Sequence, residues 1–142
     1  MKEGVSLIDS KKYLQQIERL DARIEIKLEE ETRLKEMALK TTSAPKEVTV
    51  SNGGMQDKFG GIMAKIADVK AEINRLVDRR ADIVRTIESV ENIKQMKVLY
   101  NHYAERKPLI QIASEMGIGY RQARNIHKAG LQAVNQIMQK KG

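Results

Sequence analysis

The sequence has no cysteine and no tryptophan, and it holds one phenylalanine and two prolines. The absence of cysteine excludes disulfides and thiolate chemistry, and it fits a reducing compartment. Aromatic residues make up 4% of the chain, which is too little for a large compact core. No apolar run approaches the roughly 20 residues that a membrane-spanning helix needs, and the N-terminus has no signal-peptide core. We therefore expect a soluble, cytoplasmic protein with no membrane partner.

Catalytic and cofactor-binding patterns are also missing. The two histidines, His102 and His127, stand in no cluster of metal ligands and beside no plausible nucleophile. His127 follows Ile126 near an expected packing face, which favours a structural histidine. The glycines at 53–54 and 60–61 lack the Lys-Ser/Thr of a phosphate-binding loop. We expect no enzyme, and therefore no catalytic residue, no metal site and no cofactor.

What the sequence does have is charge and helical periodicity. Charged residues make up 32% of the chain, and the apolar residues recur at helical spacing, which indicates long, thin helices. From Asp9 or Ser10 to about Lys40, the apolar positions of one predicted helix are Tyr13, Ile17, Leu20, Ile24, Leu28, Leu34 and Ala38. Lys27 and Glu31 interrupt this stripe. Proline and paired glycines then predict a flexible connector at about 41–60, with the next helix beginning near Gln56.

The strongest periodicity lies between residues 62 and 90. Its apolar positions are Ile62, Ile66, Val69, Ile73, Leu76, Ile83, Ile87 and Val90, and they follow a heptad with Arg80 in the gap. Such a seam is typical of a coiled coil. Arg80 is better explained as a device for register or partner choice than as a catalytic group. The two long helices can fold back as an antiparallel hairpin or pair between chains, and the sequence does not choose.

The heptad ends near residues 89–92. A new helix is expected from Ile93 to about Arg106, where Pro108 forces a break. Its predicted apolar set is Ile93, Met96, Leu99, Tyr100 and Tyr103. We therefore predict an all-α protein: a helical coiled-coil arm or hairpin over residues 10–91, and a C-terminal three-helix unit over residues 92–142.

The stretch from Leu109 to Lys128 predicts a helix-turn-helix. Gly117 can adopt the positive φ that ends a first helix, and Gly119 stands at the N-cap of a second. Ile118 would fill the corner between the two helices. The apolar positions of this stretch are Ile112, Ala113, Met116, Ala123, Ile126 and Gly130. In a helix-turn-helix, the second helix enters the DNA major groove.

The distribution of charge supports a DNA partner. Residues 94–142 hold nine basic and two acidic residues, an excess equal to the net charge of +7 of the whole chain. A localised basic field is typical of a nucleic-acid binder. The predicted base contacts are Tyr120, Arg121, Arg124 and Asn125, because the first turns of a recognition helix reach base edges. The predicted phosphate contacts are Lys107, Gln122 and Lys128.

Several segments carry a resemblance to a known family. They are Leu99-Tyr100-Asn101-His102-Tyr103, Ile112-Ala113, Met116-Gly117-Ile118, Arg124-Asn125-Ile126-His127 and Leu131. Together with the two long helices and their connector, they resemble small regulators from phages and prophages of Gram-positive bacteria, of the RinA and ArpU type. The C-terminal part of these regulators is similar to region four of sigma factors. The resemblance implies a late-gene transcriptional activator that binds double-stranded DNA in the bacterial host cytoplasm.

This chain departs from the family pattern at three positions. Leu109 stands where relatives often place tryptophan, Gly119 where they place a serine cap, and Ala123 where they place a larger aliphatic residue.

The long helices would then serve as a homo-oligomerisation element or as a contact surface for RNA polymerase. Two other functions fit the same pattern: a DNA-packaging subunit like the small terminase, and a coiled-coil adaptor that binds acidic protein and no DNA.

Overall fold

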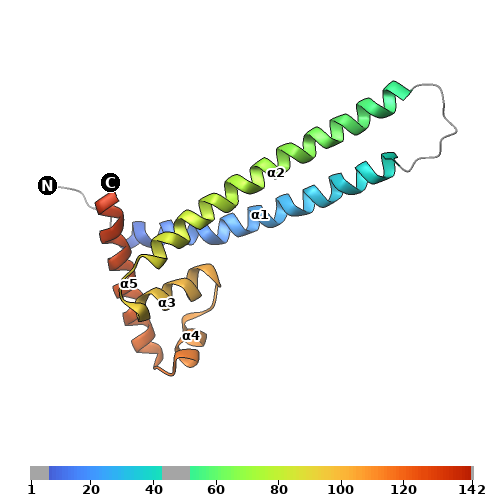
Figure 1. The fold of residues 1–142 in the computed structure, drawn as a ribbon. Coiled ribbons are helices and arrows are strands. Elements are labelled where there is room, and N and C mark those ends of the chain that lie inside the picture. Colours follow the sequence, from blue (N-terminus) through green and yellow to red (C-terminus); the bar gives the residue numbers. More distant parts are fainter. Residues whose placement is uncertain (1–6, 43–51, 142) are drawn as a thin grey trace. The chain divides into compact units, whose positions relative to one another are not determined.

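The structure, a computed structural model, describes residues 7–42 and 52–141, and these residues form helices joined by short turns. The helices are α1 (Leu7–Thr42), α2 (Asn52–Glu88), α3 (Ile93–Leu99), the π-helix η1 (Tyr100–Ala104), α4 (Leu109–Met116) and α5 (Tyr120–Lys141) (Figure 1). No strand occurs in this described part of the chain. The prediction of an all-α protein with two long helices followed by shorter ones is confirmed.

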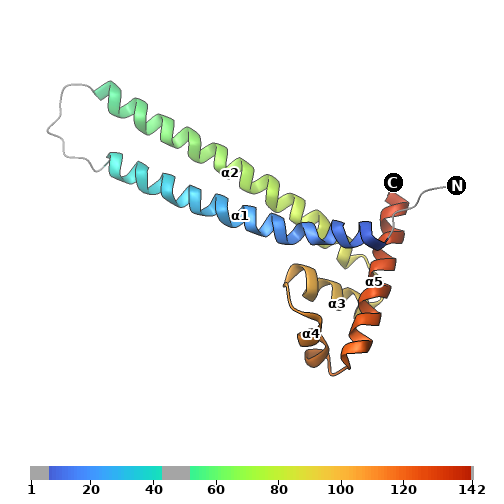
Figure 2. The same ribbon diagram turned by 180° about the vertical axis from the view of Figure 1, so that it is seen from behind.

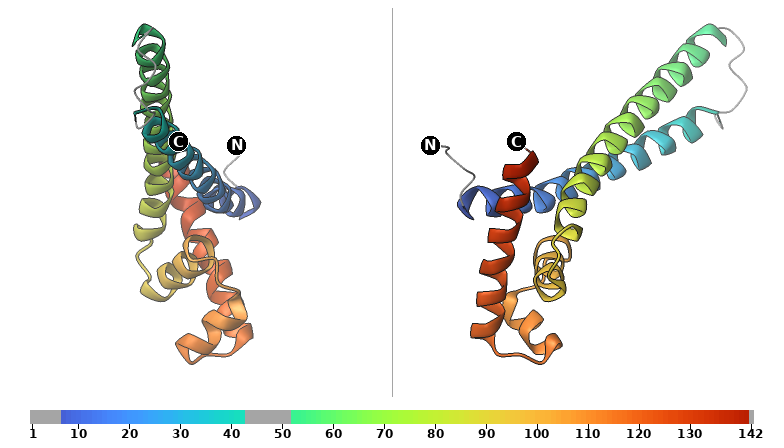
Figure 3. Two further views of the ribbon diagram at one scale, coloured as in Figure 1. Left: turned by 90° about the vertical axis from the view of Figure 1, so that its right-hand side faces the viewer. Right: turned by 60° about the vertical axis from the view of Figure 1, so that its left-hand side comes forward.

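The helices form two compact units. The hairpin unit is Ala22–Asp78, and the C-terminal unit combines the chain up to Asp21 with the chain from Arg79 onward. Both long helices therefore contribute residues to both units. In the hairpin unit, α1 and α2 lie side by side and antiparallel, as Figure 2 shows from behind and Figure 3 from two further sides. Their contact is a hydrophobic cluster of Leu34, Ala38, Ile62, Ile66 and Val69, with Phe59 and Ile73 packed against it.

Charged pairs continue the seam where apolar residues stop. Lys27 Nζ lies 3.1 Å from a carboxylate oxygen of Glu72, and Glu31 lies 3.8 Å from Lys70 Nζ. The hydrogen bond from Lys27 to Glu72 raises the pKa of Lys27 most, and its hydrogen bond to Glu30 adds to this rise. The two residues that interrupt the predicted α1 stripe therefore occupy the seam itself. Leu28, which was predicted to face the seam, is 46% exposed.

The connector is shorter than predicted. α2 begins at Asn52, so about two turns of this helix fall within the predicted connector at about 41–60. Gly60 and Gly61 lie inside α2. Each interior glycine disfavours a helix by about 1 kcal/mol relative to alanine. Apolar burial of Phe59 and Ile62 against α1 offsets this penalty. Residues 43–51, with Pro45, lie outside the described residues.

In the C-terminal unit, the first part of α1 packs against the last part of α2. Leu14, Ile17 and Ile87 are fully buried there. Tyr13 and Thr86 join the two helices through their hydroxyl groups at 3.1 Å. Ser10 is also fully buried, although its position in the sequence predicts a cap at the helix start. The N-terminal turns of α1 are therefore part of the core of this unit.

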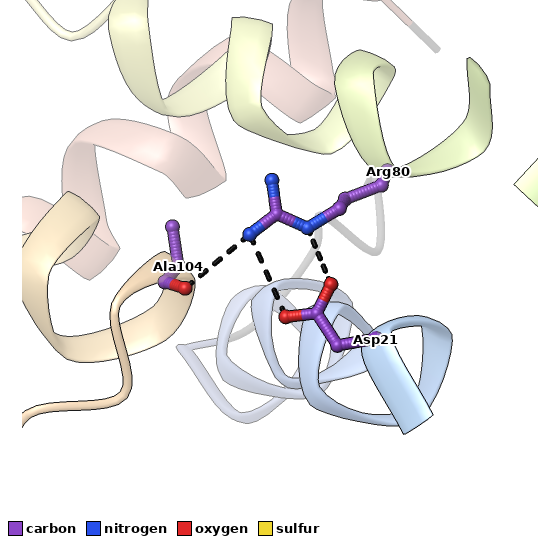
Figure 4. Close-up of polar contacts among 3 residues, drawn as sticks. All are labelled: Asp21, Arg80 and Ala104. Atoms are coloured by element: carbon purple, nitrogen blue, oxygen red, sulfur yellow. Dashed lines mark hydrogen bonds and ion pairs between the residues drawn. The ribbon is translucent and has the colours of Figure 1, made fainter. Parts of the chain in front are cut away.

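Arg80, the break in the apolar heptad, connects three elements of the C-terminal unit (Figure 4). Its Nε donates to Asp21 on α1 at 2.5 Å. Its Nη2 donates to the second oxygen of the same carboxylate at 3.5 Å and to the carbonyl oxygen of Ala104 at 3.3 Å. These three bonds link α1, α2 and η1 within one chain.

No helix in the described ranges is long and apolar enough to cross a membrane.

Candidate nucleic-acid interface

The turn between α4 and α5 has the predicted geometry. Gly117 ends α4 with φ of 68°, a left-handed conformation that glycine adopts without strain. The Ile118 amide then donates to the carbonyl of Ala113 at 2.9 Å. α5 begins at Tyr120, and the carbonyl of Gly119 accepts its first helical hydrogen bond from Ala123. The predicted roles of Gly117 and Gly119 are thus confirmed.

The packing faces of the unit lie largely where the sequence placed them. α3 and α4 both pack on α5, and the residues that they bury include Leu99, Ile112, Ala113, Ala123, Leu131 and Val134. Gly130 lies against Leu99, because a Cβ built on it would stand 3.0 Å from Leu99 Cγ. One prediction was wrong. Ile93 is 63% exposed, since it lies in the first turn of α3, and Val98 is buried instead.

The connection from α3 to α4 is a π-helix followed by one strained residue. The Glu105 amide donates to Tyr100 O at 3.1 Å, five residues back, and the Lys107 amide reaches Asn101 O at 2.9 Å. Arg106 has a φ of 57°, which is uncommon for a residue with a side chain. The wide turn and this left-handed residue end the helix at Ala104, close to the predicted end near Arg106. Pro108 then occupies the N-cap position of α4, without a side-chain hydrogen bond.

The first three turns of α5 present a polar, basic face. The predicted contact residues on this helix are all exposed: Tyr120, Arg121, Gln122, Arg124, Asn125 and Lys128. Arg121, Asn125 and Lys128 lie opposite the buried Ala123, and Tyr120 is exposed at the first residue of the helix. The 22 residues of α5 include five basic residues and no acidic one. The structure thus brings six of the seven predicted contact residues together on one exposed helix.

The seventh, Lys107, lies in the segment before α4 and already has a partner. Its Nζ donates to Glu115 at 3.0 Å, and Gln111 donates to the other oxygen of that carboxylate at 2.9 Å. The hydrogen bond from Gln111 lowers the pKa of Glu115 most, and the hydrogen bond from Lys107 lowers it further. Lys107 can therefore meet a phosphate only in competition with Glu115.

A cluster of three rings supports α5 from inside. Tyr103 on η1 and His127 on α5 share a hydrogen bond of 2.8 Å between Oη and Nε2, and the His102 ring contacts both. Burial, with smaller repulsion from His102 and Lys11, lowers the pKa of His127 to about 4. Burial also raises the pKa of Tyr103 to about 12. Both groups are neutral near pH 7, as expected for a structural histidine with a satisfied ring nitrogen.

Sequence reasoning missed two features of this surface. Arg124 lies over the ring of Tyr120, with Cζ 5.8 Å from the ring centroid. The i, i+4 spacing of the two residues was a signal that could have predicted this contact. Ile110, near the start of α4, is 66% exposed.

No group of three or more potential metal ligands occurs within residues 7–42 and 52–141.

Comparison with protein-family models, with curated proteins and with solved structures gives no match to this chain.

Proposed function

We propose that the chain is a double-stranded DNA-binding protein whose recognition helix is α5. One observation carries this proposal: the first three turns of α5 expose six polar or aromatic side chains, without a carboxylate anywhere on the helix. The tight turn at Gly117 sets α4 against this helix in the order of a helix-turn-helix. A helix of this diameter fits the major groove, where base edges are distinguishable.

Each side chain has a chemical role in this proposal. Arg121 and Arg124 can donate two hydrogen bonds to guanine O6 and N7, and Asn125 can bind the N6 and N7 edge of adenine. Gln122 and Lys128 contact phosphates, which position the helix without reading sequence. Lys107 contacts a phosphate only after it leaves Glu115, so its contribution to affinity is smaller.

The biological role that we propose is transcriptional control of phage type. It rests on the family resemblance of the sequence segments given above, which includes the similarity to sigma region four. The two long helices serve as a contact surface for a second copy or for RNA polymerase. Exposed apolar side chains on both of them, such as Ile26 and Val77, support a protein partner.

The test is selection of binding sites from random duplexes with the full chain, followed by titration of the selected duplex. Arg124→Ala and Asn125→Ala should each weaken specific binding by about 5- to 150-fold at one base position, as loss of a base contact does. Arg75→Ala is the matched control, because it removes one exposed positive charge from the hairpin unit. Specific binding that is unchanged in both α5 variants would refute the assignment of the recognition helix.

Two further measurements separate the rival functions. Sedimentation of the purified protein distinguishes a regulator, expected as a monomer or dimer, from a ring-forming DNA-packaging subunit. Affinity for DNA should fall steeply between 50 and 200 mM salt, because phosphate contacts release counterions. No DNA binding at either salt concentration would favour the protein adaptor.

A further inference from the structure

Tyr120 and Arg124 contact each other on the exposed part of α5. The two residues stand one helical turn apart, and the guanidinium carbon lies 5.8 Å from the ring centroid. Tyr120 is 49% exposed, so its ring is not part of the core. Among the described residues, no carboxylate forms an ion pair with Arg124. The aromatic ring is the partner that holds this cation.

A guanidinium held on a ring face remains available for base recognition. The attraction acts between the positive charge of the guanidinium and the π-electrons of the ring. The N–H donors lie in the plane of that group and stay free. The ring also restricts the rotamers of a long side chain before DNA arrives. Immobilising such a side chain only on binding weakens affinity by up to about tenfold.

We propose that Tyr120 and Arg124 act as one reading unit, which selects a guanine with a thymine at the neighbouring base pair. The inference rests on the proposed function and specifies its DNA ligand. Tyr120 positions Arg124 for the bidentate contact with guanine O6 and N7. The exposed ring, at the first residue of α5, packs on the C5-methyl of the thymine, the one apolar group that a base edge offers in the major groove.

The first experiment is a double-mutant cycle on the selected duplex, measured by fluorescence anisotropy with the full chain. Tyr120→Ala should weaken specific binding by about 4- to 40-fold, because it removes the methyl contact, about fourfold, and the ordering of Arg124, up to about tenfold. In the Arg124→Ala background the same change should weaken binding by only about fourfold, because only the methyl contact is left to lose. Tyr120→Phe keeps the ring and should bind within about twofold of the unchanged protein. Tyr120→Leu keeps apolar bulk without π-electrons, so it should weaken specific binding by more than about twofold.

The second experiment changes the DNA. Replacing the selected guanine by 7-deazaguanine removes the N7 acceptor, and this should weaken the unchanged protein but not Arg124→Ala. Replacing the neighbouring thymine by uracil removes only the methyl group, and this should weaken the unchanged protein by about fourfold. Uracil should have no effect on Tyr120→Ala.

The outcomes separate this inference from the function on which it rests. If site selection enriches no sequence, the DNA-reading function fails, and the inference fails with it. If a site is selected but the Tyr120 and Arg124 effects multiply independently, the reading unit is refuted and the function stands. A Tyr120→Leu variant as effective as Tyr120→Phe would also refute the unit, as would a thymine-to-uracil change without effect on the unchanged protein.

Discussion

Replacing Arg80 by methionine should destabilise the C-terminal unit by about 2 kcal/mol. Methionine keeps an unbranched side chain but donates no hydrogen bond. Asp21, whose side chain is 21% exposed, would lose its 2.5 Å charge-assisted bond, and the Ala104 carbonyl would lose its donor. Hydrogen bonds to charged groups contribute about 1.5–3 kcal/mol each. Partial water access, with Arg80 itself 29% exposed, keeps the effect below the 3–5 kcal/mol of a fully buried pair.

The assay is urea unfolding followed by circular dichroism. With a slope of about 1–3 kcal/mol/M, a loss of about 2 kcal/mol lowers the unfolding midpoint by roughly 1 M. Arg79→Met is the matched control, since Arg79 is the exposed neighbour whose bond to Gln16 is 3.4 Å long. The control should change stability by less than about 0.5 kcal/mol.

A second variant checks the cause. In Asp21→Leu combined with Arg80→Met, no carboxylate is left without its partner, so part of the lost stability should return. The reasoning is refuted if Arg80→Met lowers the midpoint no more than Arg79→Met does.

Four further predictions concern three glycines and the half-buried His127. Gly130→Ala should lower the free energy of unfolding by about 1 kcal/mol, because its Cβ would stand 3.0 Å from Leu99, and overpacking outweighs the gain in helix propensity. The same change at Gly61 in α2, where a Cβ meets nothing within 4 Å, should stabilise the protein by about 1 kcal/mol, and equal signs in urea unfolding would contradict this reasoning. Gly117→Ala should destabilise by about 1–2 kcal/mol because φ is 68°, and a Tm equal to that of the unchanged protein would be the contrary result. The pKa of His127 is about 4 in the folded protein against an ordinary 6.5. The unfolded chain therefore binds the proton more readily, and the free energy of unfolding falls as pH drops from 6.5 to 4. His127→Gln should flatten this pH dependence, and an NMR titration of His127 with a midpoint near pH 6.5 would disprove the shift.

The parts of the fold predicted from the sequence are those with a strong local cause. Gly117 marked the turn because its position requires a positive φ. The heptad from Ile62 to Val90 predicted the packing face of α2, because every third or fourth residue there is apolar except Arg80. The break at 89–92 was visible as a change of phase, and Asn92 caps α3 there through a 3.0 Å bond to the Gln95 amide.

The parts that failed depend on partners distant in sequence. Periodicity shows that a stripe is buried but not what covers it, so the burial of Ser10 and Leu14 within the C-terminal unit went unnoticed. In α1, steps of three and four residues fit two phases, and Lys27 occupies the seam that Leu28 was expected to share. The glycines before Ile62 argued against a helix locally, and packing overrode them.

The candidate site shows the same division. Exposure of Arg121 and Asn125 followed from helical phase, because these residues lie opposite the buried stripe of α5 and Arg124 flanks them. The pairing of Lys107 with Glu115 did not follow, since the two residues belong to different segments and their approach depends on the bend at Arg106. Helical phase therefore predicts which side chains are available, and tertiary structure decides which of them are already engaged.

The π-helix at Tyr100–Ala104 changes how this chain must be aligned with other three-helix domains. A turn closed by i+5 hydrogen bonds holds one residue more than a turn of α-helix, as a single-residue insertion would. A residue-by-residue alignment to a domain with a regular helix here would rotate every later position of that helix by about 100° and assign Tyr103 to the wrong face. A one-residue gap within 100–104 restores the correspondence.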